Sequence, residues 1–220
     1  TGFGVCIAGD AASAFLGMPL QGARVVIQGF GNVGKAAAKF LLERGAKIIA
    51  VSDSQGALHD PAGLDIPGLI EFVRSGKKVV ESSLDQPIGR EDMLKVPSDI
   101  FIPAARPDVF VEANQEWLQT HLVLEGANIP ITHDAARMMH ERGITIIPDI
   151  IANSGGVICA ATEYAGLSEK HAFQRIQDTI SRNTGEVLTR IRDEQLHPYD
   201  AALNMAREPI QMAKGTPVNN

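Results

Sequence analysis

The stretch VVIQGFGNVGKAAAKF, residues 25–40, constrains the fold of this chain more than any other segment. Its first part is short, β-branched and nearly free of polar residues, which is typical of a buried strand. Its last part is rich in alanine and predicts a helix over 32–44 that ends before a glycine. Between the two, Gly29, Gly31 and Gly34 form a G-x-G-x-x-G pattern. A strand, a glycine turn and a helix in immediate succession open the nucleotide-binding unit of many α/β proteins.

Each glycine has its own role if this turn holds a dinucleotide. Gly29 permits the tight turn off the strand, Gly31 lets the backbone approach a pyrophosphate, and Gly34 lets the helix pack against the strand. The phosphates would then lie on the free N–H groups of a helix that begins near Asn32. Asp53 follows Gly34 by nineteen residues, where an acid accepts hydrogen bonds from the adenosine ribose. The alternative is a structural turn in another doubly wound protein.

The rest of the chain alternates between predicted strands and helices. A helix is expected over 3–17 and another near 66–75, and loop chemistry over 54–68 precedes a polar stretch to about 97. Apolar runs at 23–29, 46–53, 98–105, 121–128 and 143–149 predict strands, with helical segments between the later ones. We therefore expect an α/β fold, a Rossmann-type doubly wound parallel sheet with additional C-terminal helices at about 169–194 and 200–213. The tail KGTPVNN is expected to fray.

Composition and charge exclude several classes of partner. The net charge is −6 and the Lys and Arg residues are scattered, which argues against nucleic acid and anionic membranes as partners. Cys6 and Cys159 are expected to be free thiols, and no leader peptide is apparent, so we expect a cytoplasmic protein. His133 and His140 are seven residues apart without a thiol or carboxylate cluster, so no metal site is predicted. The chain opens with Thr1 inside what looks like a helix, and we expect it to be part of a longer protein.

Three predicted strands end in small residues. They are followed by PAA at 103–105, GAN at 126–128 and ANSGG at 152–156. Ligands of open α/β sheets lie beyond the carboxyl ends of the strands, and an Asn amide offers a donor and an acceptor to a carboxamide. The alternative is that Ala and Gly only pack tightly and that an Asn caps a helix.

Together, six motifs resemble the cofactor-binding domain of the glutamate, leucine, phenylalanine and valine dehydrogenases. They are TGFGV, VVIQGFGNVG, VSDSQGALHDPAGLD, DIFIPAA, EGAN-P-T and PDIIANSGGV, and they cover most of residues 1–165. The long SDSQGALHDPAGLDI segment is similar to the glutamate branch. In this family the amino-terminal domain holds the substrate and carries a catalytic Lys and Asp. The resemblance implies that residues 1–220 are an NAD(P)-binding Rossmann domain and that the substrate domain and all catalytic residues lie outside this chain.

The resemblance also implies where the cofactor lies. Thr1 would contact the nicotinamide carboxamide, and Asn128 and Asn153 would lie near the same end of the cofactor. NAD is expected because Asp53 would repel a 2′-phosphate and no Lys or Arg lies between 54 and 64. NADP stays open, because the SDS sequence also occurs in relatives that use it. The complete predicted site comprises Thr1, Gly29, Phe30, Gly31, Asn32, Val33, Gly34, Asp53, Ser54, Ala104, Ala105, Asn128 and Asn153.

The expected function is oxidative deamination of an L-amino acid, with glutamate favoured, to a 2-oxo acid and ammonia in a homo-oligomeric enzyme. Ala160 stands where many glutamate enzymes carry a Ser that binds the substrate carboxylate, so a leucine, phenylalanine or valine enzyme is an alternative. The chain departs from the family pattern at two further places: it has PAARP where the family has PAALE, and Ile129 where the family usually has Gly. A non-enzymatic NAD-sensing module is a third possibility, although it would not need the GAN and NSGG loops.

Overall fold

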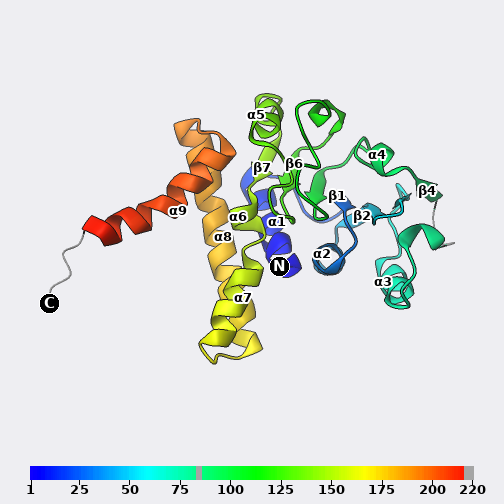
Figure 1. Ribbon diagram of the computed structural model, residues 1–220, viewed down its shortest axis with the longest axis horizontal. Coiled ribbons are helices and arrows are strands. Elements are labelled where there is room, and N and C mark those ends of the chain that lie inside the picture. The colour runs from blue at the N-terminus through cyan, green and yellow to red at the C-terminus, as the bar shows by residue number, and fades with distance from the viewer. Residues whose placement is uncertain (83–85, 216–220) are drawn as a thin grey trace.

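One mixed sheet organises the computed structural model, which describes residues 1–82 and 86–215. In the described residues seven strands lie in the order β4-β3-β2-β1-β5-β6-β7 (Figure 1). The parallel strands are β1 (Arg24–Gln28), β2 (Lys47–Ser52), β5 (Ile100–Pro103), β6 (Leu122–Leu124) and β7 (Thr145–Ile147). Two short antiparallel strands, β3 (Ala57–His59) and β4 (Gln86–Ile88), extend the sheet beyond β2. The expected α/β, doubly wound sheet is confirmed, but its antiparallel edge was not predicted.

Helices cover both faces of the sheet, and several begin where the sequence predicted. The α-helices are α1 (Gly2–Leu16), α2 (Asn32–Glu43), α3 (Ile66–Arg74), α4 (Arg90–Met93), α5 (His133–Glu141), α6 (Asp149–Ala152), α7 (Gly155–Tyr164), α8 (Glu169–Glu194) and α9 (Pro198–Gly215). Two 3₁₀ turns, η1 (Val79–Glu81) and η2 (Gln115–Trp117), lie in the connections. The predicted helices at 3–17, 32–44, 66–75, 169–194 and 200–213 are confirmed.

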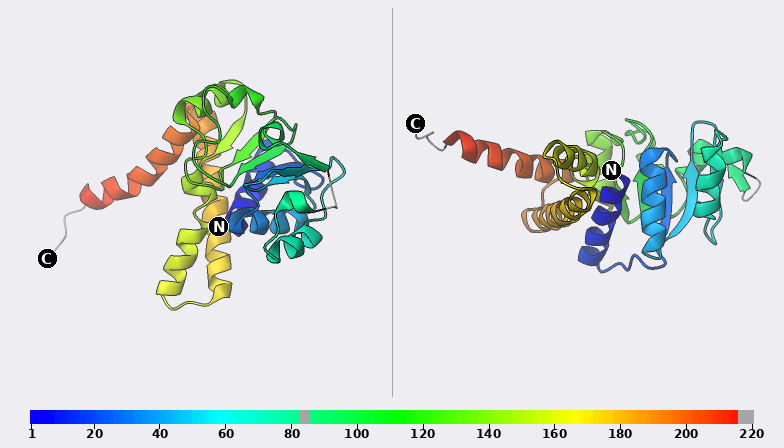
Figure 2. Two further views of the ribbon diagram at one scale, coloured as in Figure 1. Left: turned by 45° about the vertical axis from the view of Figure 1, so that its right-hand side comes forward. Right: turned by 90° about the horizontal axis from the view of Figure 1, so that it is seen from below.

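Alternate residues of each central strand point to opposite faces, and both faces are buried. In β1, Val25 and Ile27 pack in the core formed with α1, α2 and α8, whereas Val26 packs in the core formed with α4 and α5. Figure 2 shows α1 and α2 side by side on the first of these faces. Because both faces are covered, the parallel strands appear in the sequence as nearly continuous apolar runs.

Two sequence predictions about the connections were wrong, and short elements lie in a stretch for which none was predicted. The predicted loop at 54–68 contains β3, which pairs with β2, and the polar stretch to 97 contains η1, β4 and α4. The link from β5 to β6 has no α-helix, only η2. These elements are three or four residues long, too short for periodicity to reveal, and pairing with a neighbouring strand decides their form.

The C-terminal helices form a separate layer beside the sheet. Helix α8 packs along α1 and α7, whereas α9 leads away from the sheet toward the C-terminus (Figures 1 and 2). Arg190 of α8 ties the two helices together, since its guanidinium contacts the carboxylate of Glu208 at 2.5 and 2.8 Å. Of the tail expected to fray, Lys214 and Gly215 belong to α9 and 216–220 lie outside the described residues.

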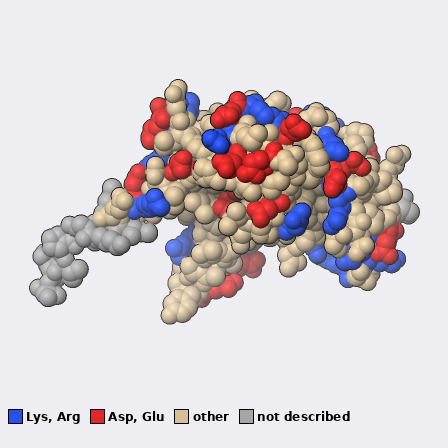
Figure 3. Space-filling model, turned by 45° about the horizontal axis from the view of Figure 1, so that its top comes forward, with Lys and Arg blue, Asp and Glu red and all other residues tan. Residues whose placement is uncertain are grey.

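Charges of both signs are interspersed on the face of the molecule shown in Figure 3. None of the helices within 1–82 and 86–215 combines the length and the apolar character that crossing a membrane requires.

Candidate cofactor site

The glycine turn between β1 and α2 has the geometry that the motif predicts. Gly29 has a φ of +104°, and a Cβ added there would lie 2.8 Å from the backbone of Ala105. A Cβ added to Gly34 would overlap the Gly29 carbonyl oxygen. A Cβ added to Gly31 would meet no atom within 4 Å. Gly34 is therefore required by packing within the turn and Gly29 by packing against Ala105, whereas the space over Gly31 is open.

A cleft of about 840 Å³ lies beside this turn at the carboxyl ends of β1, β2 and β5. The chain leaves β1 toward β2 on one side and later returns to β5 on the other side of β1. The cleft is therefore at the topological switch point, the position at which open α/β sheets bind ligands. Among the predicted site residues, Gly29, Phe30, Gly31, Asp53, Ser54, Ala104 and Ala105 line it. Phe30 is only 5% exposed, and its ring belongs to the core.

Asp53 follows β2 directly, as predicted, but its carboxylate already has two backbone partners. Oδ1 accepts a hydrogen bond from the N–H of Gln55 at 2.8 Å, and Oδ2 accepts one from the N–H of Val79 at 2.9 Å. The second bond joins residues 26 positions apart and holds the segment before η1 against the end of β2. That Asp53 binds a ribose stays a prediction.

The cleft also contains positive charge that the sequence analysis did not assign to it. Lys77 and Lys78, which precede η1, line the same cleft as Asp53 and Ser54. The sequence prediction rested on residues 54–64, which contain no Lys or Arg, whereas the KK sequence lies farther along the chain, after Gly76. The full set of basic residues in the lining is Lys35, Lys77, Lys78, Arg90 and Arg106, against the acids Asp53 and Glu91.

A second cavity of about 510 Å³ lies on the other side of the turn and contains Thr1, Asn32 and Val33. Helices α1, α2, α7 and α8 begin around it, and the first three approach one another closely. A Cβ added to Gly2 of α1 would lie 2.5 Å from the Val33 carbonyl oxygen, and one added to Gly156 of α7 would lie 2.6 Å from Oγ1 of Thr1. The glycines of TGFGV and NSGGV thus allow the amino ends of α1, α2 and α7 to meet, and each end carries partial positive charge.

The structure brings Asn128 and Asn153 together. Asn128 follows β6, whereas Asn153 follows α6, so the prediction that ANSGG comes directly after a strand was wrong. Nδ2 of Asn153 donates to Oδ1 of Asn128 at 2.8 Å and to the carbonyl of Ala127 at 3.3 Å. The Asn153 side chain thus binds the loop that follows β6, and Ser154 rather than Asn153 is the N-cap residue of α7. Neither Asn128 nor Asn153 lines either of the two cavities described above.

A buried carboxyl group supports the loop that carries Asn128, and the sequence analysis did not predict it. Glu125, at the end of β6, is fully buried, and burial raises the pKa of its carboxyl group to about 8. Its Oε1 lies 2.5 Å from the Tyr199 hydroxyl, and its Oε2 accepts from the N–H of Asp149 at 2.8 Å. The Tyr199 hydroxyl also donates to the carbonyl of Ile131 at 3.1 Å. The Tyr199 hydroxyl therefore lies within hydrogen-bonding distance of both Oε1 of Glu125 and the Ile131 carbonyl oxygen.

Comparison with known proteins shows which proteins the chain is similar to. The chain is 45% identical to the NADP-specific glutamate dehydrogenase of Saccharolobus shibatae over 188 residues, 82% of this chain and 44% of that protein. It is 42% identical to the NAD-specific glutamate dehydrogenase of Staphylococcus aureus over 164 residues, 74% of this chain and 39% of that protein. The crystal structure of the hetero-hexameric glutamate dehydrogenase from Thermus thermophilus, in its Leu-bound form, superposes with a TM-score of 0.86 at 25% identity, over 96% of this chain and 51% of that one.

The chain thus spans about half the length, or somewhat less, of the relatives that it matches. The family described as Glutamate/Leucine/Phenylalanine/Valine dehydrogenase matches residues 1–215. This match covers nearly the whole chain, from the N-terminal helix through α9. The chain therefore belongs to the glutamate/leucine/phenylalanine/valine dehydrogenase family.

Proposed function

We propose that residues 1–220 form the nicotinamide dinucleotide-binding, carboxyl-terminal domain of a glutamate dehydrogenase-like oxidoreductase. One observation carries the proposal. At the switch point of the sheet, Gly29 and Gly34 are closed in by neighbouring atoms, whereas the backbone at Gly31 faces open space at the start of α2. This is the arrangement that a pyrophosphate on a helix amino end requires.

The chain's own residues would bind and orient the cofactor. The first N–H groups of α2 would hold the pyrophosphate, and the adenosine ribose would lie in the 840 Å³ cleft beside Asp53 and Ser54. The nicotinamide end would lie toward Thr1, Asn128 and Asn153. When bound, the nicotinamide supplies the acceptor for a hydride, and the protein fixes the position of that acceptor.

The choice between NAD and NADP follows from the charge of the cleft. Asp53 favours NAD, as the sequence predicts, but two backbone N–H groups already share its charge. Lys77 and Lys78 add positive charge to the same cleft. We propose that NAD is bound and that the lysine pair gives NADP access as well. The two relatives, one named for each cofactor, are nearly equally similar, which is consistent with a cleft of this kind.

The proposed reaction of the complete enzyme is the oxidative deamination of an L-amino acid, with glutamate as the first candidate. Ala160, the position where the family resemblance expects a serine, is exposed on α7 and brings no hydroxyl group. A leucine, phenylalanine or valine enzyme is therefore the second candidate. A panel of L-amino acids, assayed with the complete enzyme, distinguishes them by relative kcat/KM.

Calorimetric titration with NAD tests the binding proposal directly. Gly31→Val places a branched side chain in the open space over the turn and is expected to abolish binding without unfolding the protein. Gly185→Val is the matched control, because a Cβ added at Gly185 on α8 also meets no atom within 4 Å. Unchanged NAD affinity in Gly31→Val, or equal loss in both variants, would show that the turn does not hold the cofactor.

We further propose that the 220-residue chain alone does not oxidise amino acids. None of its lysines was predicted to serve as the base. Of these, Lys35, Lys77 and Lys78 line the cleft on the side of Asp53, where the adenosine is proposed to lie. A single wall also cannot hold a substrate against the cofactor or exclude water. Steady NADH production by the purified chain would refute this proposal.

A further inference from the structure

We propose that His133, His197 and Asp200 form a binding site for a divalent transition-metal ion, with zinc as the reference ion. The site lies apart from the glycine turn and does not depend on the proposed function. The sequence analysis considered only His133 with His140 and therefore predicted no metal site. The structure pairs His133 with residues more than sixty positions later in the chain.

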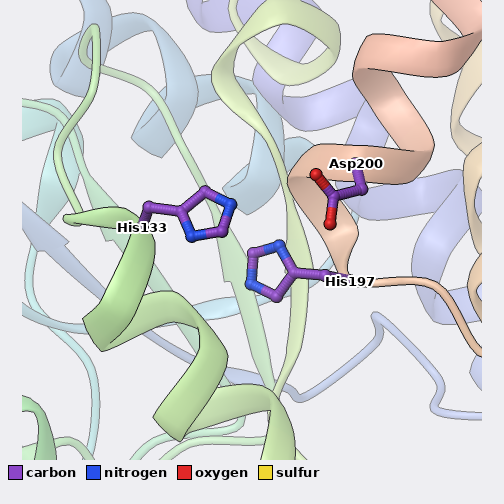
Figure 4. A group of neighbouring side chains, drawn as sticks. All are labelled: His133, His197 and Asp200. Atoms are coloured by element: carbon purple, nitrogen blue, oxygen red, sulfur yellow. The ribbon is translucent and has the colours of Figure 1, made fainter.

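The three side chains come from three segments that meet near the surface. His133 is the first residue of α5, His197 lies in the turn between α8 and α9, and Asp200 lies in the first turn of α9. One ligand atom of each residue lies within 4.8 Å of the ligand atoms of the other two. Figure 4 shows both imidazole rings and the carboxylate directed toward a common space between the helices.

The donor set suits a first-row transition metal. Two imidazole nitrogens and one carboxylate oxygen leave a fourth position for water, an arrangement that zinc commonly adopts. Zinc bonds of about 2.0–2.2 Å place tetrahedral ligand atoms roughly 3.4 Å apart, so the three donors must move closer by a small amount. His133 and Asp200 are exposed and can make this movement by rotating their side chains.

His197 makes few hydrogen bonds for a half-buried imidazole. Its Nε2 is buried and has no hydrogen-bond partner among the described residues. Its Nδ1 accepts only the N–H of Tyr199, at 3.3 Å, near the long limit for such a bond. Nδ1, not the buried Nε2, faces His133 and Asp200 (Figure 4), so an ion bound there would replace only this long contact with Tyr199.

The cluster contains a carboxylate in addition to the contact between its two imidazole rings. The His133 and His197 rings have centroids 4.6 Å apart at 32°, which by itself is an ordinary aromatic contact. Asp200 adds a carboxylate that such a stack does not need. The nearest competing cation on α5, Arg137, is paired with Asp134 at 3.0 Å. A metal ion at this site would hold the start of α9 to α5, next to Tyr199 and its bond to Glu125.

Isothermal titration calorimetry with zinc chloride and the purified protein tests the proposal. We expect one zinc ion per chain, and a weakening of at least about tenfold in both His133→Ala and Asp200→Asn. Both positions are exposed, so both variants are expected to fold, and unchanged melting temperatures without metal verify this. Cobalt(II) gives an independent spectroscopic readout, since its visible absorption bands identify tetrahedral coordination by protein ligands.

His171→Ala is the matched control, because His171 is an exposed histidine on α8 that pairs only with Ser168 in the described structure. Zinc affinity in this variant is expected to match that of the unmodified protein. Absence of zinc binding would overturn the proposal. The same holds if affinity falls equally in His171→Ala, or is unchanged in both His133→Ala and Asp200→Asn.

Discussion

Replacing Ile129 by glycine is expected to stabilise the protein, although the change removes an entire apolar side chain. Ile129 has a φ of +46°, a left-handed conformation that β-branched residues rarely adopt. Its backbone is held on both sides. Its N–H donates to Oδ2 of Asp149 at 2.8 Å, and its carbonyl accepts from the N–H of Asp108 at 3.0 Å. The chain cannot relax this strain without breaking these bonds.

The expected magnitude follows from three contributions. Glycine removes a steric cost of about 2 kcal/mol, the upper end for a side chain in this conformation. Its greater freedom in the unfolded chain costs about 0.5 kcal/mol. Ile129 is 64% exposed, so losing its limited burial costs roughly 0.7 kcal/mol, a third of the value for full burial. The net effect is a stabilisation of about 0.5–1 kcal/mol, or a rise in Tm of about 1–3 °C.

Ile150→Gly is the matched control, because Ile150 is 51% exposed and lies on α6 without a positive φ. The same change there relieves no strain and is expected to lower stability by about 1–2 kcal/mol. Urea unfolding of both variants, followed by circular dichroism, measures the difference. If Ile129→Gly lowers the free energy of unfolding as much as Ile150→Gly does, the strain argument fails.

The remaining predictions concern a buried acid, the packing of the turn and the charge of the cleft. The pKa of Glu125 is raised from 4.5 to about 8, so its contribution to stability is complete below pH 4.5 and is lost as the pH rises to 8, with a slope of about 1.4 kcal/mol per pH unit. Glu125→Gln, which is neutral at every pH, should flatten the decline of Tm over this range, and an unchanged pH profile would show that Glu125 is already ionised. Gly34→Ala should destabilise by about 1–3 kcal/mol in urea unfolding, because its Cβ would overlap the Gly29 carbonyl oxygen; wild-type stability would contradict the packing of the turn. The double change Lys77→Ala and Lys78→Ala should weaken NADP binding more than NAD binding in a competition titration. Equal weakening would show that the lysines contact a group common to both cofactors rather than the 2′-phosphate.

Local patterns in the sequence were sufficient for the elements that depend on local chemistry. The 26 residues of α8 show helical spacing throughout and were predicted with the correct bounds. The glycine turn was predicted because G-x-G-x-x-G is a local pattern, and Gly34 is needed by its contact with the Gly29 carbonyl oxygen five residues earlier. In both cases the interactions that determine the structure lie close together in the chain.

The parts that were missed depend on contacts between distant residues. Lys78 lines the cleft next to Val79, whose N–H donates to the Asp53 carboxylate. Hydrophobic periodicity in the sequence cannot reveal such a bond. The pairing of His133 with His197 requires the α8–α9 turn to return to α5. Glu125 looked like an ordinary polar residue after a strand, and only the position of Tyr199 shows that it is buried with a partner.

The short strand β4 has a consequence for how copies of the chain behave toward one another. It forms one edge of the described sheet, is three residues long, and has Pro87 at its centre, opposite Leu58 of β3. Proline has no backbone N–H, so a strand added at this edge would find one of its acceptors without a donor. Such an edge is a poor template for sheet extension, and it protects the apolar strands of the sheet interior from edge-to-edge aggregation on this side.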